Sequence, residues 1–240
     1  MEELILQVAA FVAAVFQSAI GIGFGMVAGP VVLIVLDDPA AVVISTLMSW
    51  LIALVLLPGL YRGADWAVLR RFGIGAACGL PFGLVLLALS SIAGLKLIAG
   101  VVIGGLTLAM VFGLPGVRTP GRGLDGVFGG LAGLFGGCLA IPGPPATMRM
   151  AGLGHSKMAI RATMVSFFCV VWPVILAGQW AVIGIGAETL WNAVRLVPAV
   201  LAGLFVGNWV AAKVSERVFR NVVLAFLAGT SVSLLVDAVL

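Results

Sequence analysis

Two segments rich in glycine and proline are the parts of this sequence whose residue types could bind a ligand. The first runs from Gln17 to Pro30 and the second from Gly129 to Pro145, each within an apolar stretch. Glycine and proline disfavour a continuous helix, so each segment is predicted to end one helix and begin another inside the apolar layer. A helix N-terminus carries unpaired N–H groups and a partial positive charge, which together favour an oxyanion.

The candidate anion site combines backbone groups at these two breaks with a few side chains. Glycine lets a ligand approach the backbone, and Gln17, Ser18 and Thr163 could donate hydrogen bonds. Arg195 either reaches the membrane interface or clamps the substrate. Helix packing is the alternative role for the glycines. The predicted site residues are Gln17, Ser18, Gly21, Gly23, Phe24, Gly25, Gly136, Gly137, Cys138, Pro142, Gly143, Thr163 and Arg195.

No cluster of residues in the sequence suits catalysis or metal binding. Cys78, Cys138 and Cys169 are widely spaced in apolar sequence, which indicates buried thiols rather than a metal site or a disulfide framework. His155, the single histidine, stands beside Lys157 and is interpreted as a solvated loop residue. We therefore expect no enzyme activity, no metal, no cofactor and no nucleic-acid partner.

The elements that position the candidate site are predicted to be membrane helices. Hydrophobic residues make up 62% of the chain and charged residues 9%, whereas a soluble domain carries roughly a quarter charged residues. The first uncharged run would be about 50 Å long as one helix, too long for one crossing and too short for two. The uncharged runs are 4–36, 39–61, 72–95, 97–117, 126–148, 162–187, 196–212 and 221–236.

The positions of Lys and Arg decide between two topologies. If both broken segments cross the membrane once, the basic clusters show no bias toward either side. If both segments are re-entrant hairpins, nearly all basic residues share one side of the membrane. The other side keeps only Lys96, with Arg195 near that side, and it collects most of the acidic residues. The positive-inside rule favours the re-entrant arrangement, with both termini outside the cytoplasm. That arrangement gathers four basic loops on one side, at 62–71, 118–122, 149–161 and 213–220.

The predicted fold is an all-α polytopic membrane protein made of two inverted repeats. Residues 1–117 and 118–240 each contain one broken re-entrant hairpin and three transmembrane helices, and this odd number of crossings inverts the second repeat. Weak self-similarity agrees, because Gly79-Leu80 and Gly83 recur 124 residues later. Ser49 and Ser166 also match, at an offset of 117. Packing is the favoured role for the two recurring glycine pairs.

Both broken segments carry a signature of a known family. The first reads Gln17-Ser-Ala-Ile-Gly-Ile-Gly-Phe-Gly-Met26 and is followed by Pro30; the second reads Gly129-Gly-Leu-Ala-Gly-Leu-Phe-Gly-Gly137 and is followed by Pro142. Over essentially the whole chain this layout resembles the TauE/SafE family of sulfite and organosulfur anion exporters. The first half departs in its interrupted glycine run, and the second in its cluster of prolines. The resemblance implies export of a small anion such as sulfite or a sulfonate like sulfoacetate.

The expected function is a secondary transporter in a bacterial-type inner membrane that exports such an anion by alternating access. No carboxylate lies deep in a predicted crossing, whereas proton- or sodium-coupled carriers usually need one. An inside-negative potential favours exit of a monovalent anion by about 2.3 kcal/mol per 100 mV. The expected partners are this anion and membrane lipid. Two alternatives stay open: a transporter of another small anion, with or without proton coupling, and a membrane assembly subunit that does not transport.

Overall fold

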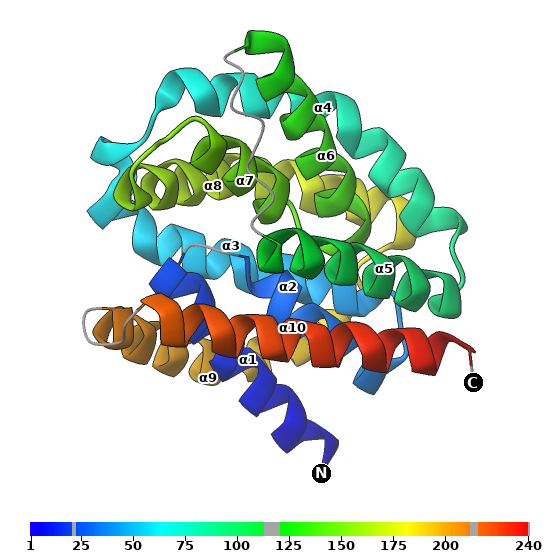
Figure 1. The fold of residues 1–240 in the computed structure, drawn as a ribbon. Coiled ribbons are helices and arrows are strands. Elements are labelled where there is room, and N and C mark those ends of the chain that lie inside the picture. The colour runs from blue at the N-terminus through cyan, green and yellow to red at the C-terminus, as the bar shows by residue number, and fades with distance from the viewer. Residues whose placement is uncertain (21–22, 113–120, 212–215, 240) are drawn as a thin grey trace.

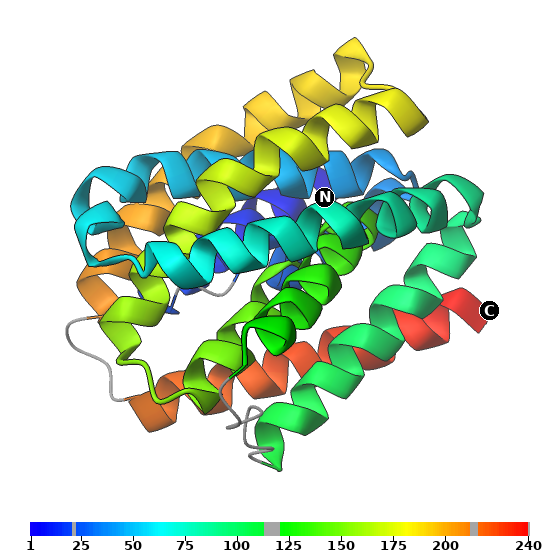
Figure 2. The ribbon, with the colours of Figure 1, turned by 90° about the horizontal axis from the view of Figure 1, so that it is seen from above.

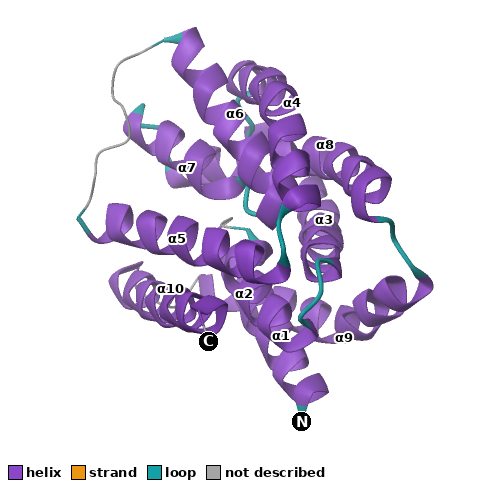
Figure 3. Ribbon diagram, turned by 90° about the vertical axis from the view of Figure 1, so that its right-hand side faces the viewer, coloured by secondary structure: helices purple, strands orange, loops and turns teal. Residues whose placement is uncertain are grey.

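The computed structural model describes residues 1–20, 23–112, 121–211 and 216–239, and these form helices almost throughout (Figures 1 and 3). No strand occurs in these ranges. The helices are α1 (Glu2–Ile20), α2 (Phe24–Leu36), α3 (Ala40–Leu60), a 3₁₀ turn η1 (Tyr61–Gly63), α4 (Trp66–Leu89), α5 (Ile92–Val111), α6 (Arg122–Leu139), α7 (Gly143–Gly152), α8 (Lys157–Ile183), α9 (Ala187–Ala211) and α10 (Glu216–Val239).

Six of the described helices are long and apolar enough to cross a membrane, namely α1, α3, α4, α5, α8 and α9. The predicted all-helical membrane fold is therefore confirmed. Five of the expected crossings, α3, α4, α5, α8 and α9, are in this set, and α1 also qualifies by its length. The sixth expected crossing lies in α10, of which Leu224–Ala238 is the described apolar stretch. The predicted repeat boundary, between residues 117 and 118, lies outside the described residues.

Both helix breaks lie where glycine and proline predict them. The first separates Ile20 from Phe24, and the second separates Leu139 from Gly143. At the second break Ala140 adopts the left-handed conformation, with φ 58°, and its N–H donates to the Gly136 carbonyl. The next N–H, of Ile141, reaches back to the Phe135 carbonyl, so two carbonyls at the end of α6 are paired by the residues that follow the helix. Each break thus joins two helices into a hairpin.

The second hairpin is closed at its base by charged residues. Arg149 of α7 contacts Asp125 of α6 at 2.7 Å, and Arg71 of α4 contacts the same carboxylate at 3.2 Å. The start of α4 and the base of this hairpin therefore lie at one end of the molecule. Gly63 abuts Ala162 near the start of α8, which brings the loop after α3 to the same end.

This end, which carries Arg62, Arg71, Arg149 and Arg161, is called the basic end below. Figure 2 shows the loop between α3 and α4 and the loop between α7 and α8 on its left-hand side, with the α8–α9 loop and the C-terminus on the right. Residues 118–120 and 213–215 of the predicted basic loops lie outside the described residues.

The opposite end, called the acidic end below, carries Glu2, Glu3, Asp37 and Asp237. α3 connects the two ends, because it begins just after Asp37 and ends before η1. The Lys96 ammonium lies 2.5 Å from Asp37 and 2.6 Å from Asp237. Lys96, the residue that breaks the charge bias, is thus neutralised by two carboxylates, and the base of the first hairpin is tied to α5 and α10.

Several helices extend beyond the uncharged runs, so the charged residues do not mark helix ends. α4 begins at Trp66 because the Asp65 side chain accepts hydrogen bonds from the N–H groups of Ala67 and Val68. Arg71 then falls inside the helix, where Asp125 compensates its charge. A capping residue and an ion pair therefore override the boundary that hydropathy suggests.

Glycine pairs allow two helix contacts between the halves of the chain. A Cβ at any of four glycines in α4 and α9 would overlap a backbone carbonyl oxygen of the facing helix. The packing role predicted for these glycines is confirmed, because only glycine permits this approach. The contacts are Gly79 on Gly130 and Gly83 on Leu134 between α4 and α6, and Gly203 on Phe11 and Gly207 on Val15 between α9 and α1.

Candidate functional site

The tips of the two hairpins touch inside the protein. A Cβ on Gly25, in the first turn of α2, would overlap the carbonyl oxygen of Ala140. A Cβ on Gly143, the first residue of α7, would lie 3.4 Å from the backbone nitrogen of Gly23. The N-termini of α2 and α7 are therefore neighbours, and glycine at position 25 is required by this close approach.

Gln17 shapes the start of α2. Its side chain is fully buried; its Oε1 accepts a 2.6 Å hydrogen bond from the Phe24 N–H, and its Nε2 donates to the Ser49 carbonyl at 3.2 Å. The Met26 N–H also donates, to the Gly23 carbonyl at 3.1 Å, so two of the N–H groups at the N-terminus of α2 are already paired. Gln17 thus acts as a cap that joins α1, α2 and α3, rather than as a free donor.

The backbone of Gly23 has free space beside it on the side where a Cβ would lie. The residue is buried, with φ −56° and ψ 141°, and no described atom outside its immediate neighbours lies within 4 Å of the position that a Cβ would take. This is the place at the first tip where a small ligand could reach the backbone. Gly21, another predicted site residue, lies outside the described residues.

The N-terminus of α7 offers fewer donors than that of α2. Its first three residues are Gly143, Pro144 and Pro145, and proline has no backbone N–H. Of these three positions only Gly143 can donate, while Pro142 precedes the helix as its N-cap. The two tips are therefore unequal: α2 provides backbone donors, and α7 mainly provides the positive end of its helix dipole.

The predicted residues at the end of α6 are used mainly for packing. A Cβ on Gly136 would meet Ile175 at 2.8 Å, and a Cβ on Gly137 would meet the Leu80 side chain at 2.9 Å. The Gly137 carbonyl accepts a 3.3 Å hydrogen bond from Gln179. Cys138 is a buried free thiol, as the sequence indicates, and Cys169 is half-buried. The prediction of a buried thiol is wrong for Cys78, which is exposed on the surface of α4.

Ser18 and Thr163 do not present free hydroxyl groups to the tips. The Ser18 hydroxyl donates to the Val15 carbonyl at 3.1 Å and faces Gly207 of α9. The Thr163 hydroxyl accepts a 2.9 Å hydrogen bond from the Asp65 N–H and so fastens the loop before α4. Both side chains support neighbouring helices.

Arg195 lies apart from the tips, near the acidic end. It is exposed, and its guanidinium lies 5.5 Å from the centre of the Trp191 ring. Together with Glu2, Gln7 and Asn192 it lines a cavity of about 180 Å³ between α1, α2, α3 and α9. The structure thus does not bring Arg195 to the other predicted site residues.

Eight buried side-chain polar atoms have no hydrogen-bond partner among the described residues, and none belongs to a predicted site residue. They include the hydroxyls of Ser45, Ser49 and Ser166 and the indole N–H of Trp172. Buried polar groups are usually paired, so such donors point to a ligand or to water. Ser49 and Ser166 could have been found, because their match between the halves was visible in the sequence.

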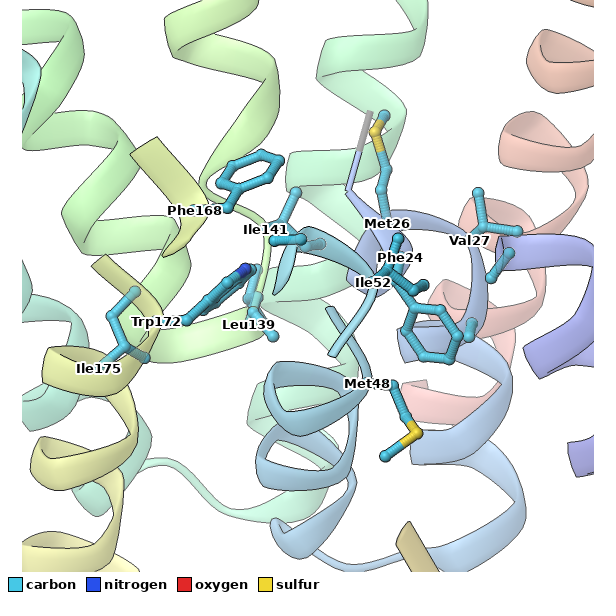
Figure 4. Packing of buried hydrophobic residues seen from close by; sticks show 14 of the residues in the cluster. Phe24, Met26, Val27, Met48, Ile52, Leu139, Ile141, Phe168, Trp172 and Ile175 are labelled. Atoms are coloured by element: carbon cyan, nitrogen blue, oxygen red, sulfur yellow. The ribbon is translucent and has the colours of Figure 1, made fainter. Parts of the chain in front are cut away.

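Aromatic and aliphatic side chains enclose the tips. Figure 4 shows Phe168, Trp172 and Ile175 of α8 on one side of Leu139 and Ile141, and Phe24 and Met26 of α2 on the other. The rings of Phe168 and Trp172 lie 5.8 Å apart. A cavity of about 10 Å³ beside the tips is lined by residues that include Gly25, Gly29 and Ser45, which is room for about one water. The tips are closed in this structure.

Comparison with known protein families gives a match over most of the chain. A family model described as sulfite exporter TauE/SafE matches residues 6–234. Comparison with the curated proteins gives no match, and comparison with the solved structures gives none. The family match covers both hairpins and reaches from α1 into α10. The chain therefore belongs to the TauE/SafE sulfite exporter family, a family of membrane anion exporters.

Proposed function

We propose that this membrane protein exports a small sulfur oxyanion or an organosulfonate that binds where the two hairpin tips meet. The single observation that carries the proposal is the contact of the tips, which places the N-terminus of α2 beside that of α7. Backbone N–H groups near Gly23 would bind the sulfur-bound oxygens. The hydroxyls of Ser45 and Ser49 and the indole of Trp172 are further donors without a partner among the described residues.

Alternating access would follow from an inverted repeat. α4 packs on α6 and α9 packs on α1, so each half lends a long helix to the hairpin of the other half. The residues in contact also occupy corresponding positions in the two halves. The contacting glycines of α9 lie 124 residues after those of α4. The residues of α1 that the α9 glycines contact lie 119 residues before the residues of α6 that the α4 glycines contact. This exchange symmetry supports two equivalent halves that rock against each other, as in other transporters built from inverted repeats.

The membrane potential would drive the export. We place the basic end in the cytoplasm of a bacterial-type cell and both termini outside, following the positive-inside rule. A monovalent anion then gains about 2.3 kcal/mol per 100 mV on leaving the cell. Efflux from proteoliposomes should accelerate when the loaded lumen is made negative, whereas a flux that ignores the imposed potential would refute this driving force.

The substitution Gly23→Ala tests the binding site. The new methyl group has space, so the fold should persist, but it would occupy the position from which a ligand reaches the backbone. Loss of one charge-assisted hydrogen bond costs about 1.5–3 kcal/mol, which is at least a tenfold loss of affinity. The measurements are flux in proteoliposomes and ligand-induced thermal stabilisation with sulfite, sulfoacetate, isethionate, taurine and carboxylate analogues.

The matched control is Gly105→Ala, at an exposed position of α5 that also has no described atom within 4 Å of the new methyl group. We expect wild-type flux from the control and at least tenfold weaker binding from Gly23→Ala. Equal flux from the two variants would contradict a site at the tips. Stabilisation by carboxylates alone would reassign the substrate class, and stabilisation by none of the panel would favour an assembly subunit.

A further inference from the structure

Arg161 differs from the other buried basic side chains in how its charge is compensated. It lies in the second turn of α8 at the basic end, and its Nη2 donates a 2.9 Å hydrogen bond to Asn208 Oδ1 of α9. Its Nε is buried and has no acceptor among the described residues. A charged N–H without an acceptor is costly, so this position calls for a physical explanation.

The other buried basic side chains have carboxylate partners. Arg149 contacts Asp125, and Lys96 contacts both Asp37 and Asp237. Within the described part of the chain, no carboxylate forms an ion pair with Arg161, and its hydrogen-bond partner is the neutral amide of Asn208. Among the described residues, the Arg161 guanidinium therefore has no balancing carboxylate, and its Nε–H is a spare donor at a partly covered position.

The location of this pair connects it to the first hairpin. Asn208 directly follows Gly207, and a Cβ on Gly207 would overlap the Ser18 hydroxyl near the end of α1. Arg161 lies two turns before Phe168, which stands beside the second tip on the same helix. The Arg161–Asn208 pair thus lies at the basic end, on two helices that continue toward the hairpin tips.

We propose that Arg161 and Asn208 form a second anion site, an access site that receives the substrate at the basic end before it reaches the tips. The fork of Nε–H and Nη–H groups would bind two oxygens of a sulfite or sulfonate group, a geometry that suits guanidinium and planar or tetrahedral oxyanions. Asn208 would hold the fork in position through Nη2. The inference rests on the proposed export of such an anion.

The test compares Arg161→Gln with Arg122→Gln in proteoliposomes. Arg122 is an exposed arginine at the first residue of α6 on the same end, so its replacement removes the same charge without touching the proposed site. We expect Arg161→Gln to raise the half-saturating concentration of sulfite or sulfoacetate about tenfold at the basic end, as loss of a charge-assisted hydrogen bond implies. The maximal rate from the basic end and the half-saturation at the acidic end should stay near wild type, and the maximal rate from the acidic end should fall by the same factor, because the substitution cannot change the transport equilibrium.

The variant Arg161→Lys separates the effect of the charge from that of the guanidinium fork, and two lipid compositions separate substrate binding from lipid binding. Lysine keeps the charge but lacks the fork, so an intermediate rise is expected. An anionic lipid headgroup offers the same oxyanion chemistry, so the assay is repeated in phosphatidylcholine alone and with phosphatidylglycerol added. An Arg161→Gln effect that persists in phosphatidylcholine supports the access site, and one that appears only with phosphatidylglycerol assigns the arginine to lipid and overturns the inference.

Two further outcomes separate the inference from the proposed function. If wild-type protein moves an anion of the panel and Arg161→Gln matches Arg122→Gln, only the access site is wrong. An equal rise in half-saturation at both ends also overturns it, because it indicates a defect at the shared tips. If wild-type protein moves none of these anions, the proposed function itself fails.

Discussion

Replacing Asp125 with asparagine is expected to destabilise the second hairpin at its base. The Arg149 guanidinium is fully buried and lies 2.7 Å from this carboxylate, whose side chain is 4% exposed. Removing one partner of a buried ion pair costs about 3–5 kcal/mol, because the remaining charge stays in a poorly solvated site. Arg71 contacts the same carboxylate at 3.2 Å but is 29% exposed, so losing that contact adds less than about 1 kcal/mol.

The prediction gives an order of effects. Asp125→Asn should cost most, since it removes the carboxylate that balances the buried charge of Arg149. Arg149→Met should cost less, because Asp125 keeps Arg71 as a partner, and Arg71→Gln should cost least. Thermal and denaturant unfolding in detergent would measure these changes, with the exposed Glu188→Gln as a carboxylate-to-amide control.

The apolar double variant Asp125→Leu with Arg149→Met offers a further check. Replacing a buried pair by hydrophobic residues of similar size is often neutral or stabilising, so the double variant should recover most of the loss. The reasoning would be refuted if Arg71→Gln destabilised the protein as much as Asp125→Asn, or if Asp125→Asn stayed within about 1 kcal/mol of wild type.

Two further predictions concern the hairpin contacts. Gln17→Leu removes the acceptor of the Phe24 N–H, so the free energy of unfolding should fall by about 1–3 kcal/mol and the flux should fall with it; wild-type stability in denaturant unfolding would contradict the capping role. Gly79→Ala places a methyl group on the Gly130 carbonyl and must push α4 from α6, so its melting temperature should fall, whereas Gly105→Ala should not lower it. Equal melting temperatures for the two alanine variants would contradict the packing role.

Local chemistry made the helix breaks and the sides of the loops predictable. Glycine and proline act within a few residues, so both breaks were found where the sequence indicates them. Most of the described basic residues gather at one end of the molecule, as the positive-inside rule predicts for Lys and Arg in short loops, and the contacts of Arg71 and Arg161 agree with that gathering.

The roles of single side chains depend on neighbours that one sequence does not reveal. Ser18 looked like a donor for the ligand, but Gly207 brings α9 against its face of α1. Thr163 looked similar, but it accepts a hydrogen bond from a residue 98 positions away. The effect of Pro144 and Pro145 can, in contrast, be predicted from the sequence. Proline lacks an N–H in any fold, so these residues reduce the number of backbone donors at the N-terminus of α7.

The separation of charge between the two ends has a consequence for kinetics. A net positive surface raises the local concentration of anions, and a net negative one lowers it, over about 10 Å at ordinary ionic strength. The exporter would therefore saturate at lower bulk anion concentration from the basic end than from the acidic end, and released anion would compete weakly for return. Equilibrium is unaffected, since a surface field changes the rates of arrival and departure together. Raising the salt concentration should shrink this difference between the two directions.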